Sequence, residues 1–299
     1  MNTRICTLLA TVLLLTSLTA AAQQRFEKKF SVSNGGTLTL STDEGSVKII
    51  GGSSGEVSVV ADIRGRERDV KEFEVGATQS GNNVDVTGKL HKSGWFWNSV
   101  DLDVEFTVNV PREYSLKLHT SGGNISVSAV KGSVRGKTSG GNVSVGSTEG
   151  DVDLETSGGN IDAEKCNGNL RMRTSGGEIQ ISSATGDLDV ETSGGDVRIT
   201  DVDGKINAGT SGGNMYLKLK GANKGIHLET SGGDIDIAIP KSASANIDAG
   251  TSGGGVHFDF PVTVSGHIDE SHVQGTLNGG GNTIYAHTSG GDIRFRSTD

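Results

Sequence analysis

The chain has 299 residues, of which 46 are Gly and only 4% are aromatic, and its formal net charge is -9. Glycine at this frequency without a Gly-X-Y period excludes collagen, and the alternating β-branched residues exclude plain disorder. Dispersed acidic charge excludes a typical nucleic-acid binder, and the scarcity of aromatic residues predicts a thin core made by repeating one small packing unit.

The first 22 residues have the layout of a cleavable export signal. Arg4 is followed by an apolar run from Ile5 to Leu18 and then by three alanines before Gln23. The run is shorter than the ~20 residues that a membrane-spanning helix requires. We therefore expect residues 1–22 to be removed on export, which leaves a periplasmic, outer-surface or secreted protein whose only membrane contact was its signal.

Residues 23–115 predict an amino-terminal β region. Alternating strands follow a nine-residue rhythm over 26–63, the rhythm is lost over 64–98, and a long alternating strand then runs to Pro111. An uncovered edge of a solenoid invites aggregation, so we expect this region to cap the repeats that follow.

An aromatic cluster, Trp95-Phe96-Trp97, lies in the part of this region that has no rhythm. Two roles are open for it: packing inside the cap, or contact with a glycan or protein partner. These three residues are the candidate partner site that the sequence offers.

Residues 116–299 are dominated by a repeat. The tetrapeptide Thr-Ser-Gly-Gly recurs five times at an 18-residue interval and then at longer intervals, which we interpret as insertions in the later units; it begins at Thr120, Thr138, Thr156, Thr174, Thr192, Thr210, Thr230, Thr251 and Thr288. Each unit carries two short strands with apolar residues two apart, such as Ile161 and Ala163, so one face points inward and the other outward.

This pattern predicts an all-β fold, a parallel β-solenoid of the β-helix or β-roll kind with about 18 residues and two strands in each coil. The Thr-Ser-Gly-Gly segments would form the turns, since glycine permits positive φ and close approach of backbones. The next residue is mostly Asn or Asp, which predicts a ladder of stacked amides along the turns.

Outward charges indicate how the coils stack. At an 18-residue step, each of two columns alternates in sign; the columns are Arg135, Asp153, Arg171 and Asp189, and Lys137, Glu155, Arg173 and Glu191. Stacking in register would place opposite charges ~4.8 Å apart, where they attract.

Sites for chemistry are scarce in the sequence. Cys166 is the only cysteine after the signal, which excludes an intramolecular disulfide, and the histidines show no zinc-ligand spacing. The Gly-Gly-x-Gly-x-Asp motif of a calcium β-roll is absent. Carboxylates such as Asp151 and Asp153 could serve a carbohydrate-active enzyme, but such short coils leave little loop for a cleft. We expect no catalytic residue, no cofactor and no metal.

A family resemblance is carried by residues 110–125 (VPREYSLKLHTSGGNI), by their echo at 239–254 and by the ending over 277–293. The sequence resembles the bacterial putative-adhesin family of exported β-strand-repeat proteins, a family of unknown function. The resemblance covers nearly all of the chain after the signal and implies the fold but no catalytic residue.

The expected function is therefore that of a non-enzymatic exported scaffold or adhesin-like binding module at the cell envelope. Its partner would be an envelope glycan or protein and not a nucleic acid, while its oligomeric state is open. The alternative is a carbohydrate-active hydrolase or lyase that uses surface carboxylates.

Overall fold

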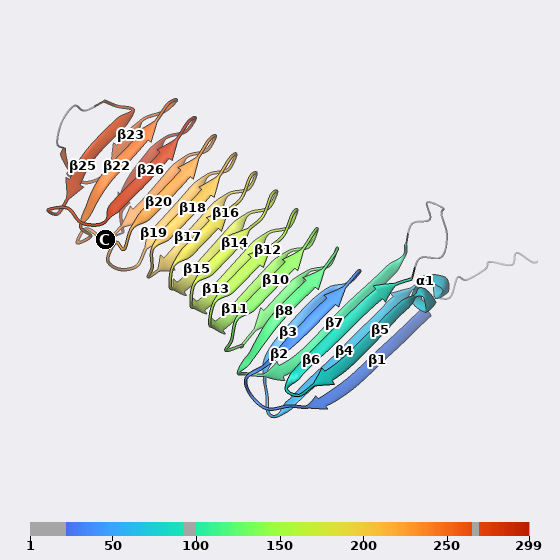
Figure 1. Cartoon of the computed structure of the whole chain (residues 1–299). Helices are drawn as coiled ribbons and strands as arrows, with labels where there is room; N and C mark the ends of the chain where they lie inside the picture. Colours follow the sequence, from blue (N-terminus) through green and yellow to red (C-terminus); the bar gives the residue numbers. More distant parts are fainter. Residues whose placement is uncertain (1–21, 92–99, 265–268, 299) are drawn as a thin grey trace, which may run out of the picture.

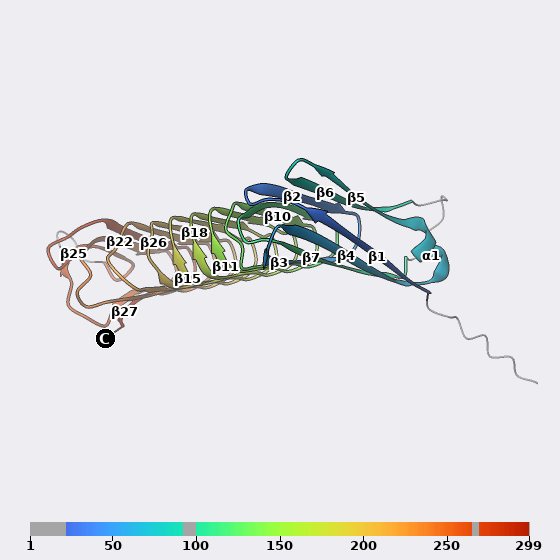
Figure 2. The same ribbon diagram turned by 90° about the horizontal axis from the view of Figure 1, so that it is seen from below.

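The computed structural model describes residues 22–91, 100–264 and 269–298. Two long β-sheets lie against each other as the two layers of a flattened solenoid (Figures 1 and 2). Sheet A has 13 strands in the order β1-β4-β7-β3-β9-β11-β13-β15-β17-β19-β21-β27-β23, and sheet B has 14 in the order β24-β25-β22-β26-β20-β18-β16-β14-β12-β10-β8-β2-β6-β5. The predicted all-β solenoid is confirmed.

The middle of the stack is regular, because each coil supplies one strand to each sheet. The sheet A strands are β9 (Ile125–Ser128), β11 (Val143–Glu149), β13 (Ile161–Asn167), β15 (Ile179–Thr185), β17 (Val197–Val202), β19 (Met215–Leu219) and β21 (Ile235–Ile239). The sheet B strands are β8 (Tyr114–Thr120), β10 (Val134–Thr138), β12 (Val152–Glu155), β14 (Leu170–Arg173), β16 (Leu188–Glu191), β18 (Ile206–Thr210) and β20 (Ile226–Thr230). Adjacent strands are parallel and in register, so Ile161 lies opposite Val143 and Ile179.

The core fills the narrow space between the two sheets. Inward residues two apart along each strand, such as Ile161 and Ala163, are buried in coil after coil. Val256 and Phe258 at the carboxy-terminal end differ, since both are half-buried. Small aliphatic side chains are enough for so thin an interior, and each large one contributes about 1.5–3 kcal/mol when buried.

The turns confirm the predicted close approach of backbones, but positive φ does not occur in the Thr-Ser-Gly-Gly motifs. Positive φ occurs in the turn half a coil away, at Gly150 (130°) and Gly168 (144°), and the Thr-Ser-Gly-Gly glycines, all of which are described, do not adopt it. The second glycine of each motif is instead needed for close approach: a Cβ on Gly159 would overlap the carbonyl oxygen of Gly141 in the preceding coil. A side chain on Gly158 would meet nothing closer than 3.8 Å.

The threonine of each motif joins adjacent turns from inside. The buried Thr156 hydroxyl donates to the carbonyl oxygen of Gly141 (2.8 Å) and accepts from the N–H of Gly159 (3.3 Å). These hydrogen bonds run along the stack and satisfy backbone groups that the turn would otherwise leave unpaired.

The amino-terminal strands continue both sheets beyond the repeats. Their bounds are β1 (Ala22–Ser31), β2 (Gly36–Thr42), β3 (Ser46–Ser53), β4 (Glu56–Gly65), β5 (Phe73–Ser80), β6 (Asn83–Leu90) and β7 (Leu102–Pro111), with helix α1 (Glu67–Glu72) between β4 and β5. Strands β2 and β3 stack directly on β8 and β9, and the other five lie beyond them, toward the end that carries α1 (Figure 1). The sheets run without a break past residue 115, where the domain boundary stays a prediction.

The carboxy-terminal coils do not stack in chain order. The strands there are β22 (Ala245–Thr251), β23 (Val256–Phe258), β24 (Thr263–Val264), β25 (His272–Leu277), β26 (Thr283–Thr288) and β27 (Ile293–Ser297). The last coil, β26 and β27, lies between the coil of β20 and β21 and the coil of β22 and β23 (Figure 1). The 37-residue interval before Thr288 is therefore a change in stacking order, and the interpretation as an insertion within a linear stack is wrong there.

The charge columns on the outer face of sheet B form as predicted. Across adjacent coils the Nε of Arg135 lies 3.3 Å from Asp153, and the Nε of Arg173 lies 3.0 Å from Glu191. Such exposed pairs contribute about 0.2–1 kcal/mol each. Their main effect is that the charges on this face neutralise one another.

Candidate functional site

A shallow groove runs along the outer face of sheet A. One depression of about 390 Å³ lies over β15, β17, β19, β21 and β27, and another of about 490 Å³ lies over β9, β11, β13 and β15. The two share Gln180, and together we call them the sheet A groove. It crosses eight neighbouring strands, which gives a length of about 34 Å along the stack.

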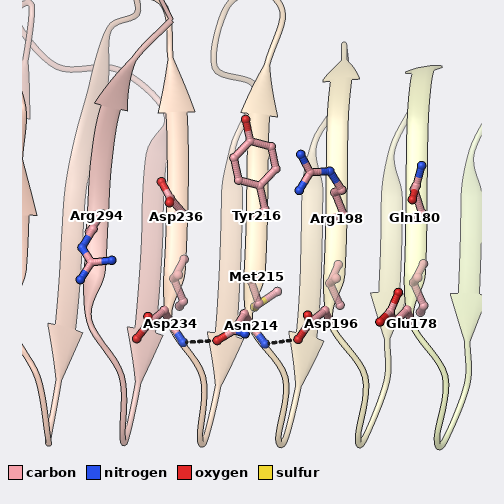
Figure 3. Close-up of a pocket in the computed structure, with 13 residues that line it drawn as sticks. Glu178, Gln180, Asp196, Arg198, Asn214, Met215, Tyr216, Asp234, Asp236 and Arg294 are labelled. Atoms are coloured by element: carbon pink, nitrogen blue, oxygen red, sulfur yellow. Dashed lines mark hydrogen bonds between the residues drawn. The ribbon is translucent and has the colours of Figure 1, made fainter.

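Two rows of side chains border the half of the groove that lies over β15 to β27 (Figure 3). In-register pairing places one outward residue of each strand beside the next, and this strand row consists of Gln180, Arg198, Tyr216, Asp236 and Arg294. The turn row follows the Thr-Ser-Gly-Gly motifs and consists of Glu178, Asp196, Asn214 and Asp234. Between the rows lies the backbone of inward-facing residues such as Val197 and Met215.

Hydrogen bonds between coils hold the turn row in place. The side-chain oxygen of Asp196 accepts the backbone N–H of Asn214 (2.7 Å), and Asn214 in turn accepts the N–H of Asp234 (3.0 Å), as Figure 3 shows. The ladder thus joins side chain to backbone, and the predicted stacking of amides on one another is wrong. Since each step needs only one acceptor oxygen, Asp serves as well as Asn, and the second carboxylate oxygen of an Asp takes no part in its step.

Tyr216 and Arg198 lie side by side at the middle of the strand row (Figure 3). The guanidinium carbon of Arg198 is 4.3 Å from the centroid of the Tyr216 ring, within the range of a cation–π contact. This contact joins β17 to β19 and holds both long side chains over the groove.

Asp236 is the next residue of the row and has one oxygen in use. Its Oδ2 is 2.8 Å from Nη2 of Arg296, while its Oδ1 is buried and has no hydrogen-bond partner among the described residues. A buried carboxylate oxygen without a donor costs about 1–3 kcal/mol. Among the described residues that line the groove, Asp236 thus carries a buried polar atom whose hydrogen-bonding capacity is unused.

The groove is acidic, in contrast to sheet B. Six carboxylates and two guanidinium groups line its described part; they are Asp162, Glu164, Glu178, Asp196, Asp234 and Asp236, and Arg198 and Arg294. A shallow depression with this excess attracts cations and repels anions, and it tolerates neutral ligands.

Asp162 lies on the strand β13 in the half of the groove over β9 to β15, where its side chain is exposed but desolvation by the surrounding atoms raises the pKa of its carboxyl above 3.8. Desolvation disfavours the charged form, so the folded protein holds this proton more tightly than the unfolded chain does. The contribution of this proton to the free energy of unfolding is fully present below pH 3.8. It is lost as the pH rises through the raised pKa of the folded protein.

An Asp162→Asn variant is therefore expected to be more stable than the parent at pH 7 and to show no such gain at pH 3.5, because the amide is neutral at both. Urea unfolding at the two pH values measures the difference. Asp153→Asn on sheet B is the control and should bring no gain at pH 7, since it removes the ion pair with Arg135. An equal effect of Asp162→Asn at both pH values would contradict the assignment.

The residues singled out from the sequence do not form this site. Trp95, Phe96 and Trp97 lie outside the described residues, so their contact with a partner stays a prediction. Asp153 pairs with Arg135, and Asp151 accepts the backbone N–H of Asn169 (3.0 Å). The sequence signal for the groove lies in the outward residues of the first strand in each unit, such as Gln180 and Tyr216. An 18-residue step from Ser126 leads through most of them.

Three further features bear on chemistry and location. Cys166 is buried and free, and burial raises the pKa of its thiol, which keeps the thiol protonated. Within the described ranges, no group of three or more His, Cys, Asp or Glu side chains is arranged to hold a metal ion. In the same part of the chain, no helix has the length and apolar character needed to cross a membrane.

Comparison with known proteins identifies a family. The family model described as Toastrack DUF4097 matches residues 36–296. A search of curated proteins finds no match.

Three solved structures are similar over most of their length. A "putative cell adhesion protein" from Clostridium sporogenes is 14% identical, with 92% of this chain and 100% of the other covered and a TM-score of 0.23. A "putative adhesin" from Bacteroides fragilis is 12% identical, with 91% and 97% covered and a TM-score of 0.41. A "putative lipid binding protein" from Parabacteroides distasonis is 14% identical, with 91% and 96% covered and a TM-score of 0.49.

Proposed function

Because the chain belongs to the Toastrack DUF4097 family, whose description specifies no activity, we propose its function from its own surface: it is a non-enzymatic, exported binding module at the cell envelope. The sheet A groove holds the ligand, an extended polar polymer that lies along the stack. An exported protein agrees with the signal predicted over residues 1–22. A glycan or a protein of the envelope is the partner expected from the sequence.

The contrast between the two outer faces carries this proposal. On sheet B, the charged side chains pair with one another from coil to coil, as Arg135 does with Asp153. Along the sheet A groove, the carboxylates outnumber the guanidinium groups, and the Oδ1 atom of Asp236 lacks a donor among the described residues. Polar side chains that are held in place and keep unused hydrogen-bonding capacity are what a binding surface presents to a ligand.

One observation favours the alternative of a carbohydrate-active enzyme. Asp162, with its raised pKa, and Glu164 are two apart on β13 and line the same half of the groove. A strand places such residues about 7 Å apart, within the range of the two carboxylates of an inverting glycosidase. The groove is shallow and open, however, and an enzyme needs a site that excludes water.

Filling the groove tests the binding proposal. Trp substituted for Gln180, where the two depressions meet, should block the groove without touching the core. We expect the Gln180→Trp variant to bind about tenfold less polymer from an envelope fraction than the parent does, or less still. Bound hexose and bound protein are the quantities measured. Asn207→Trp, at an outward position of β18 in sheet B, is the matched control and should bind like the parent.

Equal retention by the parent and the Gln180→Trp variant would overturn the proposal. Release of sugar fragments by the parent, abolished in an Asp162→Asn variant that still binds, would instead establish the enzyme.

A further inference from the structure

We propose that the ligand of the sheet A groove is a neutral or amino-bearing polysaccharide, with one sugar ring against Tyr216 and a hydroxyl or amino group donating to Asp236. This inference rests on the proposed function and names the class of its ligand. It makes the segment from Arg198 to Arg294 of the strand row the principal subsite.

The direction of the groove disfavours a peptide. The groove crosses the strands, so successive side chains within each row are ~4.8 Å apart. An extended peptide advances ~3.3 Å per residue. The backbone beneath the groove is already used in the ladders between strands, as Ile179 pairs with Ile161 on one side and Val197 on the other. A peptide would therefore have to satisfy its own alternating N–H and C=O groups with side chains that do not match its spacing.

Sugar hydroxyls suit the same rows of side chains. A hydroxyl donates and accepts, so it can meet a carboxylate such as Asp236 at one position and a guanidinium such as Arg198 at the next. A chain of rings carries several hydroxyls on each unit and needs no fixed alternation. The repeating side chains of the groove thus fit a repeating polyhydroxylated ligand.

Tyr216 determines where one ring would lie. It is the only aromatic side chain among the described residues that line the groove. An aromatic ring offers an apolar surface for the C–H face of a sugar while its hydroxyl remains free for hydrogen bonds. The contact with Arg198 at 4.3 Å already positions this ring, so little side-chain entropy remains to be lost on binding.

Asp236 lies one strand away from Tyr216 and pairs with it in register. A ring on Tyr216 therefore brings its substituents next to this carboxylate. The buried Oδ1 of Asp236 has no donor among the described residues, and a ligand donor reaches this oxygen only if the Asp236 side chain turns toward the groove. A hydroxyl would satisfy the oxygen, and an ammonium group would in addition neutralise its charge.

The charge of the groove selects among polysaccharides. Its carboxylates outnumber its guanidinium groups by six to two, so polymers of sugar acids are repelled. Beyond Gln180 the outward positions toward β9 are Asp162 and the small residues Ser144 and Ser126, which leave room for a long chain to continue along the face.

Calorimetric titration of the full exported chain with hexamers of different charge tests the inference. The probes are cellohexaose, maltohexaose and hexa-N-acetylchitohexaose (neutral), the chitosan hexamer (amino-bearing), hexagalacturonate (acidic) and hexalysine (a basic peptide). We expect at least one neutral or amino-bearing hexamer to bind, with hexagalacturonate weaker by about tenfold or more.

Two tyrosines on opposite faces provide matched variants. Tyr216→Ala is expected to weaken binding of that hexamer by about tenfold, whereas Tyr285→Ala on the outer face of sheet B should leave the affinity within about twofold. An Asp236→Asn variant should lose affinity most for the chitosan hexamer. Unfolding midpoints of all three variants confirm that they fold.

Several outcomes would overturn the inference. The inference fails if none of the four neutral or amino-bearing hexamers binds, or if the protein prefers hexagalacturonate or hexalysine. It also fails if the two tyrosine variants weaken binding equally. If Gln180→Trp still abolished retention of envelope polymer in those cases, the binding module would stand and only its ligand class would be wrong. If Gln180→Trp also had no effect, both proposals would fail.

Discussion

A Gly159→Ala variant is expected to lose about 3 kcal/mol of its free energy of unfolding, although only a methyl group is added. The new Cβ would overlap the carbonyl oxygen of Gly141 in the preceding coil. Neither backbone can move away alone, because the Thr156 hydroxyl hydrogen-bonds to both residues at this turn. Two coils would have to separate locally, with loss of hydrogen bonds and packing on both sides.

The adjacent glycine of the same motif provides the control. A Cβ on Gly158 would have 3.8 Å to the nearest atom, the carbonyl oxygen of Gly140, and Gly158 does not adopt a positive φ. Gly158→Ala is therefore expected to be neutral or to stabilise by up to about 1 kcal/mol, since alanine restricts the unfolded chain. Urea unfolding of the two variants makes the comparison, and equal losses would show that close approach is not what requires glycine at position 159.

Removal of residues 278–299 is expected to be the more damaging change to the fold, with a loss of about 5 kcal/mol or more. The truncation deletes β26 and β27, which lie between two other coils of the stack. It takes away fully buried side chains, among them Ile284, Ile293 and Phe295. It also leaves β22 with no parallel neighbour and β23 with no pairing strand, since β23 pairs only with β27 in the described part of the chain.

Deletion of an internal coil, residues 156–173, is the matched control. The flanking coils can close on each other in the same register, because each carries the same motif at the same position. Asp153 would then meet Asp189, and Glu155 would meet Glu191, at a cost of up to about 1 kcal/mol for each exposed like-charge pair. Thermal unfolding by circular dichroism should show a modest shift for this deletion and a large one for the truncation. Similar shifts for both would mean that the last coil is no more important than any other.

Much of the repeat region could be predicted because spatial neighbours in a solenoid are also separated by a constant distance in sequence. An 18-residue step from Val143 leads to Ile161, a second one leads to Ile179, and the structure places these three side by side in the core. The same step predicts the pairing of Arg135 with Asp153, which the register of β10 and β12 confirms. In such a fold, a periodic sequence pattern directly predicts tertiary contacts.

The turns show where this reasoning stops. Close approach to the preceding coil requires glycine at both 159 and 168, but only Gly168 also adopts a positive φ, of 144°. Both glycines recur every 18 residues, so the sequence pattern is the same at the two positions. Only the backbone conformation in the structure distinguishes why each must be glycine. The Asn and Asp ladder is a similar case, because its partner is a backbone N–H that nearly every residue possesses.

By itself, the sequence determined the class of fold, the inward and outward faces of the repeated strands and the in-register stacking of their charges, because all three follow from one constant period. Only the tertiary structure decided the order of the final coils, since Thr288 lies beside both Thr230 and Thr251 and nothing periodic distinguishes these neighbours. The sheet A groove was decided there too. The groove depends on the sizes of side chains that meet across several strands. It also includes a carboxylate oxygen of Asp236 that has no donor among the described residues. Both features arise from packing in three dimensions.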